Sequence, residues 1–368
     1  MDDVVAGVRS PFELDVRPIA RFLNAELRDH PVYDGLELQW FDDAWHGTGM
    51  LAFLSRRADR RVDYYADPTL SLDRSTYQIG GGTGAWSTTE FEADRLDVDA
   101  GGVVADVRFT DIDGRRIEVN VDDRGRRPRR SSDLLAPVGG GIDEPASLLL
   151  VYLHGFDLVR RSRRPPRILV DGMSADTGVL PGGFLHRRHL IKAAAPLTVV
   201  TLCPTRHDEP LPPVSDPDHR TMSDDGAAIA GVAAARGDLS ARLVLDPPLP
   251  DLVTLPDGVP LRGAWRLDVD GAAVTGGAWR AQRRGARVEL GLDVTQPWEP
   301  PAGRPLLMRI VTRVVPLFRT WPTTYRWSAQ VELAVSGGRI TSSWQRTTTD
   351  RGESYRRATG GRGPRSAS

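Results

Sequence analysis

The sequence contains almost no cysteine and almost no lysine. Cys203 is the only cysteine in 368 residues, so no internal disulfide can form, and Lys192 is the only lysine. A single thiol is typical of proteins from a reducing compartment. Arginine in place of lysine is typical of a high-GC bacterial genome, so arginine runs such as Arg160–Arg164 are interpreted as solvated loops rather than as binding sites.

An excess of charge of either sign is also missing. The 49 acidic residues nearly cancel the 48 basic residues, which leaves a formal net charge of -1. A chain this close to neutrality has no general attraction for a polyanion, so no nucleic-acid partner is predicted.

Long apolar runs are missing as well. No stretch approaches the roughly 20 consecutive apolar residues that a membrane-spanning helix needs, which predicts no stable membrane insertion. The first residues, Met1-Asp2-Asp3, lack the basic start and apolar core of a signal peptide. With the single cysteine, these absences predict a cytoplasmic protein.

Complete motifs for cofactors and catalysis are absent too. The glycine-rich run at 80–84 lacks the Lys-Ser/Thr ending of a phosphate loop. Ser174 does not lie in a Gly-x-Ser-x-Gly nucleophile motif. The sequence therefore predicts no cofactor.

What the sequence does contain is a long series of short alternating segments. Apolar residues recur at every second position on both sides of Asp113-Gly114, a dipeptide that favours a hairpin turn. The arrangement returns around Asp270-Gly271 and Arg284-Gly285. Many short strands at regular spacing predict an all-β, mainly antiparallel protein of the barrel or sandwich type.

The N-terminal segment departs from this alternation. Four apolar residues fall at helical spacing, Ile19, Phe22, Leu23 and Leu27. Pro18 stands near the start of this segment and Pro31 just beyond its end, as is typical of helix boundaries. A short helix is therefore predicted over residues 16–29.

A proline-rich, acidic stretch divides the chain into two β-rich halves. It contains five prolines between positions 204 and 217, which argues against a helix or a central strand. The predicted divisions are a helical arm (1–30), a first β-barrel or sandwich domain (31–203), a linker (204–222), a second such domain (223–351) and a disordered tail (352–368).

One segment of the second half is ambiguous. The apolar residues of Leu307–Phe318 fall at helical spacing, with Arg309 and Arg313 on the other face. A short amphipathic helix over a barrel mouth and a core strand fit this pattern equally. A membrane-surface helix is a third interpretation.

The strongest candidate for acid–base chemistry is His154. It lies in Leu148–Val159, which is apolar at successive positions and predicts a strand buried on both faces. An imidazole there, beside Tyr152 and Phe156, is suited to proton transfer at neutral pH. The alternative is a packed histidine with an ordinary hydrogen-bond partner.

Two aspartates are candidates for a second polar group. Asp171 follows the apolar run 168–170, where burial can raise a carboxyl pKa, although Asp171-Gly172 can equally form a turn. Asp43 lies in an aromatic stretch with Trp45, and Tyr65 follows. Aromatic residues with a few polar groups are the usual lining of a small-molecule pocket. The predicted substrate-binding walls are Trp45, Tyr65, Tyr152 and Phe156.

His186 and His189 raise the question of a metal. Their spacing places both on one face of a helix but on different faces of a strand. The spacing matches no specific metal motif, and no metal is predicted.

The two β-rich halves and the proline-rich crossover give the chain a family resemblance. Over about Tyr33–Thr349, with Trp86 and Trp265 opening comparable strands, it resembles the double lipocalin-like proteins. These include the carotenoid 1,2-hydratases (hydroxyneurosporene synthases) and related natural-product cyclases. The resemblance implies two lipocalin-like halves and a cavity for an apolar molecule, often with acid catalysis and no cofactor.

These observations lead to a functional hypothesis. The chain is predicted to be a cofactor-independent enzyme that hydrates, isomerises or cyclises a hydrophobic terpenoid, lipid or polyketide. His154 serves as acid or base, with Asp171 or Asp43 as a second polar group. The alternatives are a non-catalytic lipid- or pigment-binding protein and a carbohydrate-binding or scaffold β-sandwich. The last would expose a row that Trp298, Trp321, Trp327 and Trp344 could form, although Trp327 and Trp344 fit strand packing as well.

Overall fold

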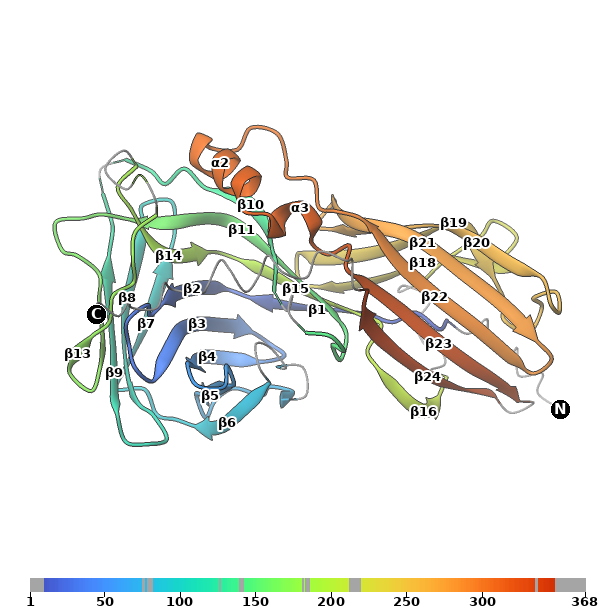
Figure 1. Ribbon diagram of the computed structural model, residues 1–368, viewed down its shortest axis with the longest axis horizontal. Coiled ribbons are helices and arrows are strands. Elements are labelled where there is room, and N and C mark those ends of the chain that lie inside the picture. Colours follow the sequence, from blue (N-terminus) through green and yellow to red (C-terminus); the bar gives the residue numbers. More distant parts are fainter. Residues whose placement is uncertain are drawn as a thin grey trace, which may run out of the picture.

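The computed structural model shows a mostly β, largely antiparallel protein (Figure 1). It describes residues 10–74, 77, 82–125, 127–138, 142–180, 182, 186–211, 220–334 and 337–347. Among these residues the strands form three sheets, two in the first half of the chain and one in the second.

The first sheet has ten strands and is strongly curled. In spatial order they are β1 (Leu14–Ile19), β15 (Leu197–Leu202), β11 (Leu148–Arg160), β14 (Arg188–Ala194), β2 (Arg21–Glu26), β3 (Tyr33–Asp43), β4 (Gly47–Arg56), β5 (Val62–Ala66) and β6 (Thr83–Thr88), with β10 (Ser132–Ala136) paired to β11. The pairs are antiparallel except β5 with β6. The curl brings β1 close to β3.

The second sheet covers the outer face of this curl. Its strands are β13 (Met173–Ser174), β12 (Arg167–Val170), β9 (Arg116–Asp122), β8 (Val103–Thr110) and β7 (Ala93–Val98). Leu36 and Leu38 of β3 belong with Val107 and Val119 to one apolar core between the two sheets. The alternation of β8 and β9 around Asp113-Gly114 is confirmed as a hairpin.

The second half forms one sheet of nine strands. They are β16 (Arg206–Pro210), β24 (Gly337–Arg346), β23 (Tyr325–Ala334), β22 (Arg287–Gln296), β21 (Ala272–Arg284), β20 (Pro260–Val269), β19 (Leu239–Pro250), β18 (Ala228–Arg236) and β17 (Arg220–Met222). The hairpins predicted at Asp270-Gly271 and Arg284-Gly285 are confirmed.

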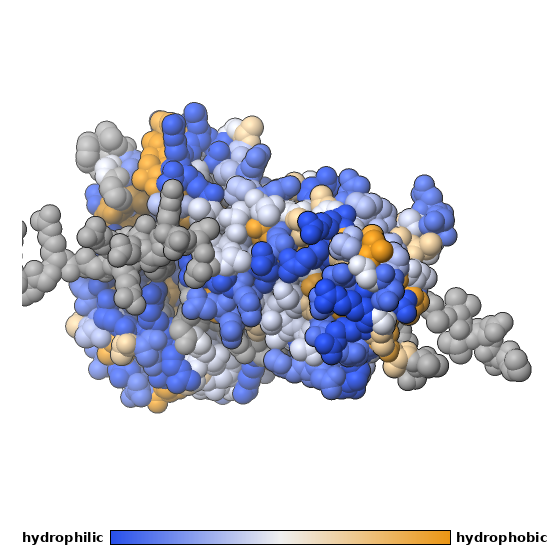
Figure 2. Space-filling view, turned by 45° about the vertical axis from the view of Figure 1, so that its right-hand side comes forward, coloured by the Kyte–Doolittle hydropathy of each residue, from blue (hydrophilic) through white to orange (hydrophobic). Residues whose placement is uncertain are grey.

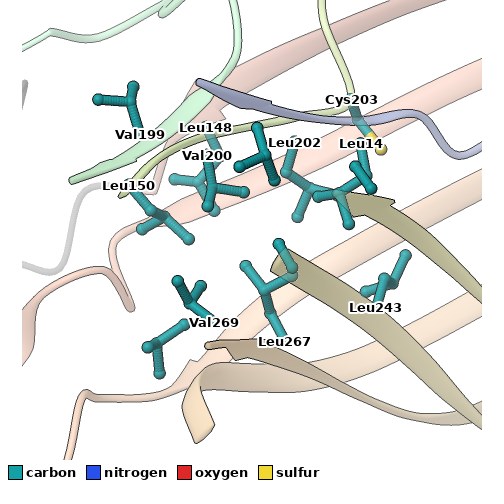
Figure 3. Packing of buried hydrophobic residues seen from close by; sticks show 14 of the residues in the cluster. Leu14, Leu148, Leu150, Val199, Val200, Leu202, Cys203, Leu243, Leu267 and Val269 are labelled. Carbon is teal, nitrogen blue, oxygen red and sulfur yellow. The ribbon is translucent and has the colours of Figure 1, made fainter. Parts of the chain in front are cut away.

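The two halves share one apolar core, which runs between β11 and β15 on one side and the nine-stranded sheet on the other (Figure 3). Leu150 and Val200 face Leu267 and Val269 there, while Val199, on the other face of β15, points away. Leu148–Val159 was predicted to be buried on both faces. Leu148, Leu150 and Tyr152 on one face are buried, whereas Leu149 and Val151 on the other are only partly buried and line a cavity.

The predicted N-terminal helix is wrong. Residues 14–26 form β1 and β2, with a single residue between them. Phe22 faces the inside of the curl, whereas Leu23 and Ala25 belong to the core between the two sheets of the first half. A strand buried on both faces loses its alternation, and its apolar residues then imitate helical spacing.

The ambiguous segment of the second half is helical. It forms α2 (Leu306–Val314) and the single turn α3 (Leu317–Thr320), which precede β23. No helix in the described ranges is long and apolar enough to cross a bilayer.

The predicted linker contributes an edge strand at each margin of the nine-stranded sheet. β16 pairs with β24 and β17 pairs with β18. Prolines such as Pro210 are tolerated at a sheet edge because no further strand needs their backbone donor. Residues 212–219 and the tail 352–368 lie outside the described residues.

The tryptophans of the second half do not form an exposed row. Trp298, Trp321, Trp327 and Trp344 are all buried, with exposed fractions of 4% or less. Their rings fill the core of this half and its junction with the first. The surface that a carbohydrate-binding interpretation requires of these four residues is therefore not present.

Candidate functional site

The inner face of the curled ten-stranded sheet encloses a cavity of about 90 Å³. Its apolar walls are Ile19, Phe22, Phe41, Phe53, Ala136, Val138, Leu149, Val151, Leu153, Leu197 and Val199. Its polar residues are Arg17, Glu37, Gln39 and Tyr77. A mostly apolar space with a few convergent polar groups is the usual composition of a small-molecule site.

Glu37 and Gln39 reach this cavity because of the pleat of β3. Successive side chains of a strand point to opposite faces, so Glu37, Gln39 and Phe41 point inward. Leu36 and Leu38 point outward, into the core between the two sheets. The two polar residues therefore line the cavity, on the face of β3 opposite the core between the two sheets.

A row of polar side chains holds Glu37 in place. Asn24 of β2 lies opposite Glu37, and Lys192 of β14 lies opposite Asn24. The Asn24 amide donates to Glu37 Oε2 at 3.2 Å, and the Gln39 amide donates to Glu37 Oε1 at 2.7 Å. Lys192 Nζ donates to Asn24 Oδ1 at 3.2 Å and pairs with Glu26 near the surface.

Burial controls the protonation of Glu37. Removal from water raises its pKa to about 7, against the lowering effects of the hydrogen bonds from Gln39 and Asn24 and of the Lys192 charge. The raised pKa brings the proton equilibrium of this carboxyl close to neutral pH. That is the range in which a carboxylic acid both gives and takes a proton efficiently.

Gln39 leaves a polar group for a ligand. Its side chain is 7% exposed, and Oε1 has no hydrogen-bond partner among the described residues. A buried acceptor without a partner costs free energy, which a hydroxyl or N–H group in the cavity would recover. If the amide is turned over, its NH2 group faces the cavity instead, so one polar end is available in either orientation.

Arg17 and Tyr77 form a second polar pair at the cavity. The guanidinium carbon of Arg17 lies 5.3 Å from the centre of the Tyr77 ring. Burial raises the pKa of Tyr77 to about 12, so its hydroxyl stays protonated at physiological pH. The pair supplies a fixed positive charge and a neutral phenol near the same space as Glu37.

The arrangement combines a proton donor, a hydrogen-bonding amide and a cation in an apolar enclosure. Searches against protein-family models, curated proteins and solved structures return no match. The chemistry of this cavity therefore has to be inferred from its own residues.

His154 is held at the junction of the two halves rather than in the cavity. Its Nε2 donates to Asp270 Oδ2 at 2.9 Å, and the Thr198 hydroxyl donates to the same oxygen at 2.6 Å. Asp270, in the β20–β21 turn, also accepts the backbone N–H of Ser240 at 2.6 Å. The histidine thus joins β11 to the second sheet, as in the packed-histidine alternative.

Replacing His154 is therefore expected to affect stability rather than chemistry. His154→Ala removes one of three hydrogen bonds to Asp270 and should lower the free energy of unfolding by about 1–2 kcal/mol, as measured by urea denaturation. His207→Ala, at an exposed histidine, is the control and should change it by less than about 0.5 kcal/mol. Turnover lost in a folded His154→Ala protein would restore the catalytic hypothesis.

The two predicted aspartates lie apart from each other and from the cavity lining. Asp171 is exposed in the turn between β12 and β13, with a φ of 53°, as in its turn interpretation. Asp43 accepts hydrogen bonds from Trp45 and His46 in the β3–β4 turn. Burial alone raises the Asp43 pKa, but the bonds from the His46 side chain and the backbone outweigh it and lower that pKa. Asp43 thus remains an ionised turn residue.

The four predicted walls are also dispersed, and none lines the cavity. Trp45 is 48% exposed beneath the Arg236 guanidinium, 5.1 Å from its ring centre. Tyr65 lies in the core between the two sheets of the first half. Tyr152 packs edge-on against His154, and Phe156 is buried farther along β11.

The predicted histidine pair forms no cluster of metal ligands. Within the described residues no three side chains of the His, Cys, Asp or Glu type converge on one point. His186 Nδ1 accepts the backbone N–H of Arg188 at 3.2 Å, and His189 forms an isolated bridge with Val179.

The arginine runs line a different kind of hollow. A wide, open groove of about 1130 Å³ lies between residues 122–125, 127, 160–164 and 187. Arg161, Arg163 and Arg164 are exposed there, as interpreted from the sequence. Because this groove is open and charged, it does not enclose an apolar molecule, and the candidate site remains the Glu37 cavity.

Sequence reasoning missed Glu37 because its pattern is that of an ordinary strand. In Leu36–Trp40, polar and apolar residues alternate as on a sheet with one solvated face. The available signal was the combination of this alternation with the barrel prediction, since inward positions of a barrel need not be apolar.

Proposed function

We propose that this protein is a cofactor-independent enzyme that acts on a small hydrophobic molecule bound in the Glu37 cavity. The observation that supports this most is the position of Glu37, whose pKa is raised to about 7 among apolar walls. A carboxyl in such surroundings is suited to general acid–base catalysis at neutral pH.

In the proposed chemistry, Glu37 transfers a proton to a carbon–carbon double bond or an oxygen atom of the substrate. Protonated Glu37 gives its proton to the substrate, and the carboxylate then takes one back from the cationic intermediate or from attacking water. The net reaction is a hydration, an isomerisation or a cyclisation. Asn24 and Gln39 would stabilise the carboxylate between these two steps, because both donate to its oxygens.

The size of the cavity limits the substrate. Drug-sized ligands occupy pockets of roughly 300–1,000 Å³, several times larger than this one. The buried part of the substrate is therefore proposed to be one ring or a short branched chain with a single hydroxyl or carbonyl group. A longer terpenoid, lipid or polyketide would enter with one end only.

We also propose that both halves of the chain are lipocalin-like. A curled ten-stranded sheet around an apolar cavity is consistent with a lipocalin-like first half, and the nine-stranded antiparallel sheet is consistent with a second. The resemblance to carotenoid 1,2-hydratases and related cyclases supports acid catalysis without a cofactor.

Blocking the cavity tests the proposal without touching Glu37. Val151→Phe adds a ring to the wall and is expected to weaken binding of small cyclic alcohols and ketones by at least tenfold, as measured by native mass spectrometry. Val253→Phe is the control, because Val253 is 55% exposed and lies outside the cavity lining. Compounds retained by wild type are then incubated with it and analysed for products by gas chromatography.

The outcomes separate the proposed enzyme from its alternatives. Retained compounds that are converted support the enzyme, whereas retained compounds that stay unchanged favour a carrier. Equal retention by Val151→Phe and wild type would place binding outside this cavity and contradict the proposal.

A further inference from the structure

Helix α2 presents a stripe of apolar side chains to solvent. Leu306, Ile310 and Val314 follow one another at four-residue spacing, with 67%, 50% and 68% of their surfaces exposed. The buried residues of the helix, Met308 and Thr312, lie on its opposite side and hold it against the protein. The exposed stripe is thus an apolar face that folding does not use.

The same segment carries positive charge only. Residues 300–324 contain four arginines and no aspartate or glutamate. Arg309, Arg313 and Arg319 are exposed, and none of them forms an ion pair with a carboxylate in the described part of the chain. In Figure 2 hydrophobic and strongly hydrophilic groups adjoin at the top of the molecule, which is where α2 lies in Figure 1.

We propose that α2 docks this protein on the surface of an anionic lipid bilayer. Leu306, Ile310 and Val314 enter the headgroup region, while Arg309 and Arg313 remain at the level of the lipid phosphates. A helix with an apolar face and flanking arginines has the chemistry of an interfacial helix. Docking of this kind is reversible and requires no membrane-spanning segment.

The charge pattern favours a lipid surface over a second copy of the chain as the partner that covers the α2 stripe. A two-fold contact through the stripe would bring the arginines of both copies together. Residues 300–324 offer no carboxylate to neutralise them. An anionic bilayer neutralises every one of these arginines, and each arginine near such a surface strengthens binding by about fivefold.

This proposal extends the proposed function but does not rest on it. Hydrophobic small molecules partition into bilayers, so docking would bring the cavity to the place where such substrates accumulate. The docking residues and Glu37 belong to different elements. A Glu37→Gln protein should therefore bind vesicles as wild type does, which keeps failure of one proposal distinguishable from failure of the other.

The test is co-sedimentation of the full chain with lipid vesicles. Wild type is compared on vesicles of mixed phosphatidylglycerol and phosphatidylcholine and on vesicles of phosphatidylcholine alone, at low and high salt. One variant replaces the stripe, Leu306→Ser/Ile310→Ser/Val314→Ser, and one removes charge, Arg309→Gln/Arg313→Gln. The matched control is Val253→Ser/Val259→Ser, which changes two exposed valines outside α2. Circular dichroism checks that each variant is folded.

Wild type is expected to bind the anionic vesicles at low salt. Its affinity should be at least tenfold lower for neutral vesicles, and at least tenfold lower for anionic vesicles at high salt. The stripe variant should lose at least tenfold in vesicle affinity and the charge variant about twenty-five-fold, while the control binds as wild type. No binding of wild type to anionic vesicles overturns the proposal, as does equal binding by all variants. A dimer in analytical ultracentrifugation that the stripe variant abolishes would assign the stripe to a second copy.

Discussion

Glu37→Gln is expected to abolish turnover of any compound that the cavity converts. The amide has the size of the carboxyl but cannot exchange a proton, so the rate should fall by about 10²–10⁴-fold while binding changes little. The pH profile of wild-type kcat/KM should show a group near the Glu37 pKa of about 7. Rates are compared at saturating and at low substrate concentration, so that effects on kcat and KM are separated.

The matched control is Glu26→Gln. Glu26 lies on the neighbouring strand β2, pairs with Lys192 at 3.3 Å and has a half-exposed side chain. It belongs to the same polar row but does not line the cavity. Its replacement should leave turnover within about twofold of wild type. Equal losses in both variants would indicate a structural effect of the row rather than proton transfer by Glu37.

Glu37→Gln should also change how the free energy of unfolding depends on pH. The folded-state pKa of Glu37, about 7, lies above its ordinary value of 4.5, so the folded protein binds the proton more tightly than the unfolded chain. The stability from this proton is fully present below pH 4.5 and is lost as pH rises through 7. Between pH 5 and pH 8 the free energy of unfolding of wild type should therefore fall by about 2–3 kcal/mol relative to that of Glu37→Gln, as measured by urea denaturation.

Trp344→Ala is expected to have the largest effect on folding. The Trp344 ring is fully buried between the halves, and its Nε1 donates to the carbonyl oxygens of Leu202 and Cys203 at 3.2 and 2.8 Å. Its removal leaves a cavity and two carbonyls without their donor. The free energy of unfolding should fall by about 3–5 kcal/mol, as measured by urea denaturation followed by circular dichroism.

Trp45→Ala provides the comparison for this substitution. It removes the same side chain from a site that is 48% exposed, where the loss should stay below about 1 kcal/mol. If Trp344→Ala were as mild as Trp45→Ala, the burial of this ring and its bonds to Leu202 and Cys203 could not contribute much to stability.

The β architecture was predictable because turn chemistry is local. Asp113-Gly114 and Asp270-Gly271 favour tight turns wherever they occur, and alternation on either side marks the paired strands. The prediction failed at β1 and β2, where both faces are buried by layers far away in sequence. The local sequence pattern of a strand does not indicate whether distant segments will cover its second face.

The site was less predictable than the fold for the same reason. His154 attracted attention as a polar residue in an apolar strand, yet its partner Asp270 lies 116 residues away in the other half. Glu37 looked like a solvent-facing residue, and only the curl of the sheet encloses it. Which polar residue of a strand is enclosed depends on long-range closure rather than on strand pattern.

The most direct test of this account is the titration of Glu37 itself. Protein labelled with ¹³C at glutamate carboxyl carbons is followed by NMR from pH 4 to pH 9, and the Glu37 signal is assigned by its absence in Glu37→Gln. The account predicts a midpoint near 7 that shifts when a compound occupies the cavity. A midpoint near 4.5, unmoved by any retained compound, would show that Glu37 is an ordinary solvated carboxylate and would contradict the proposed active site.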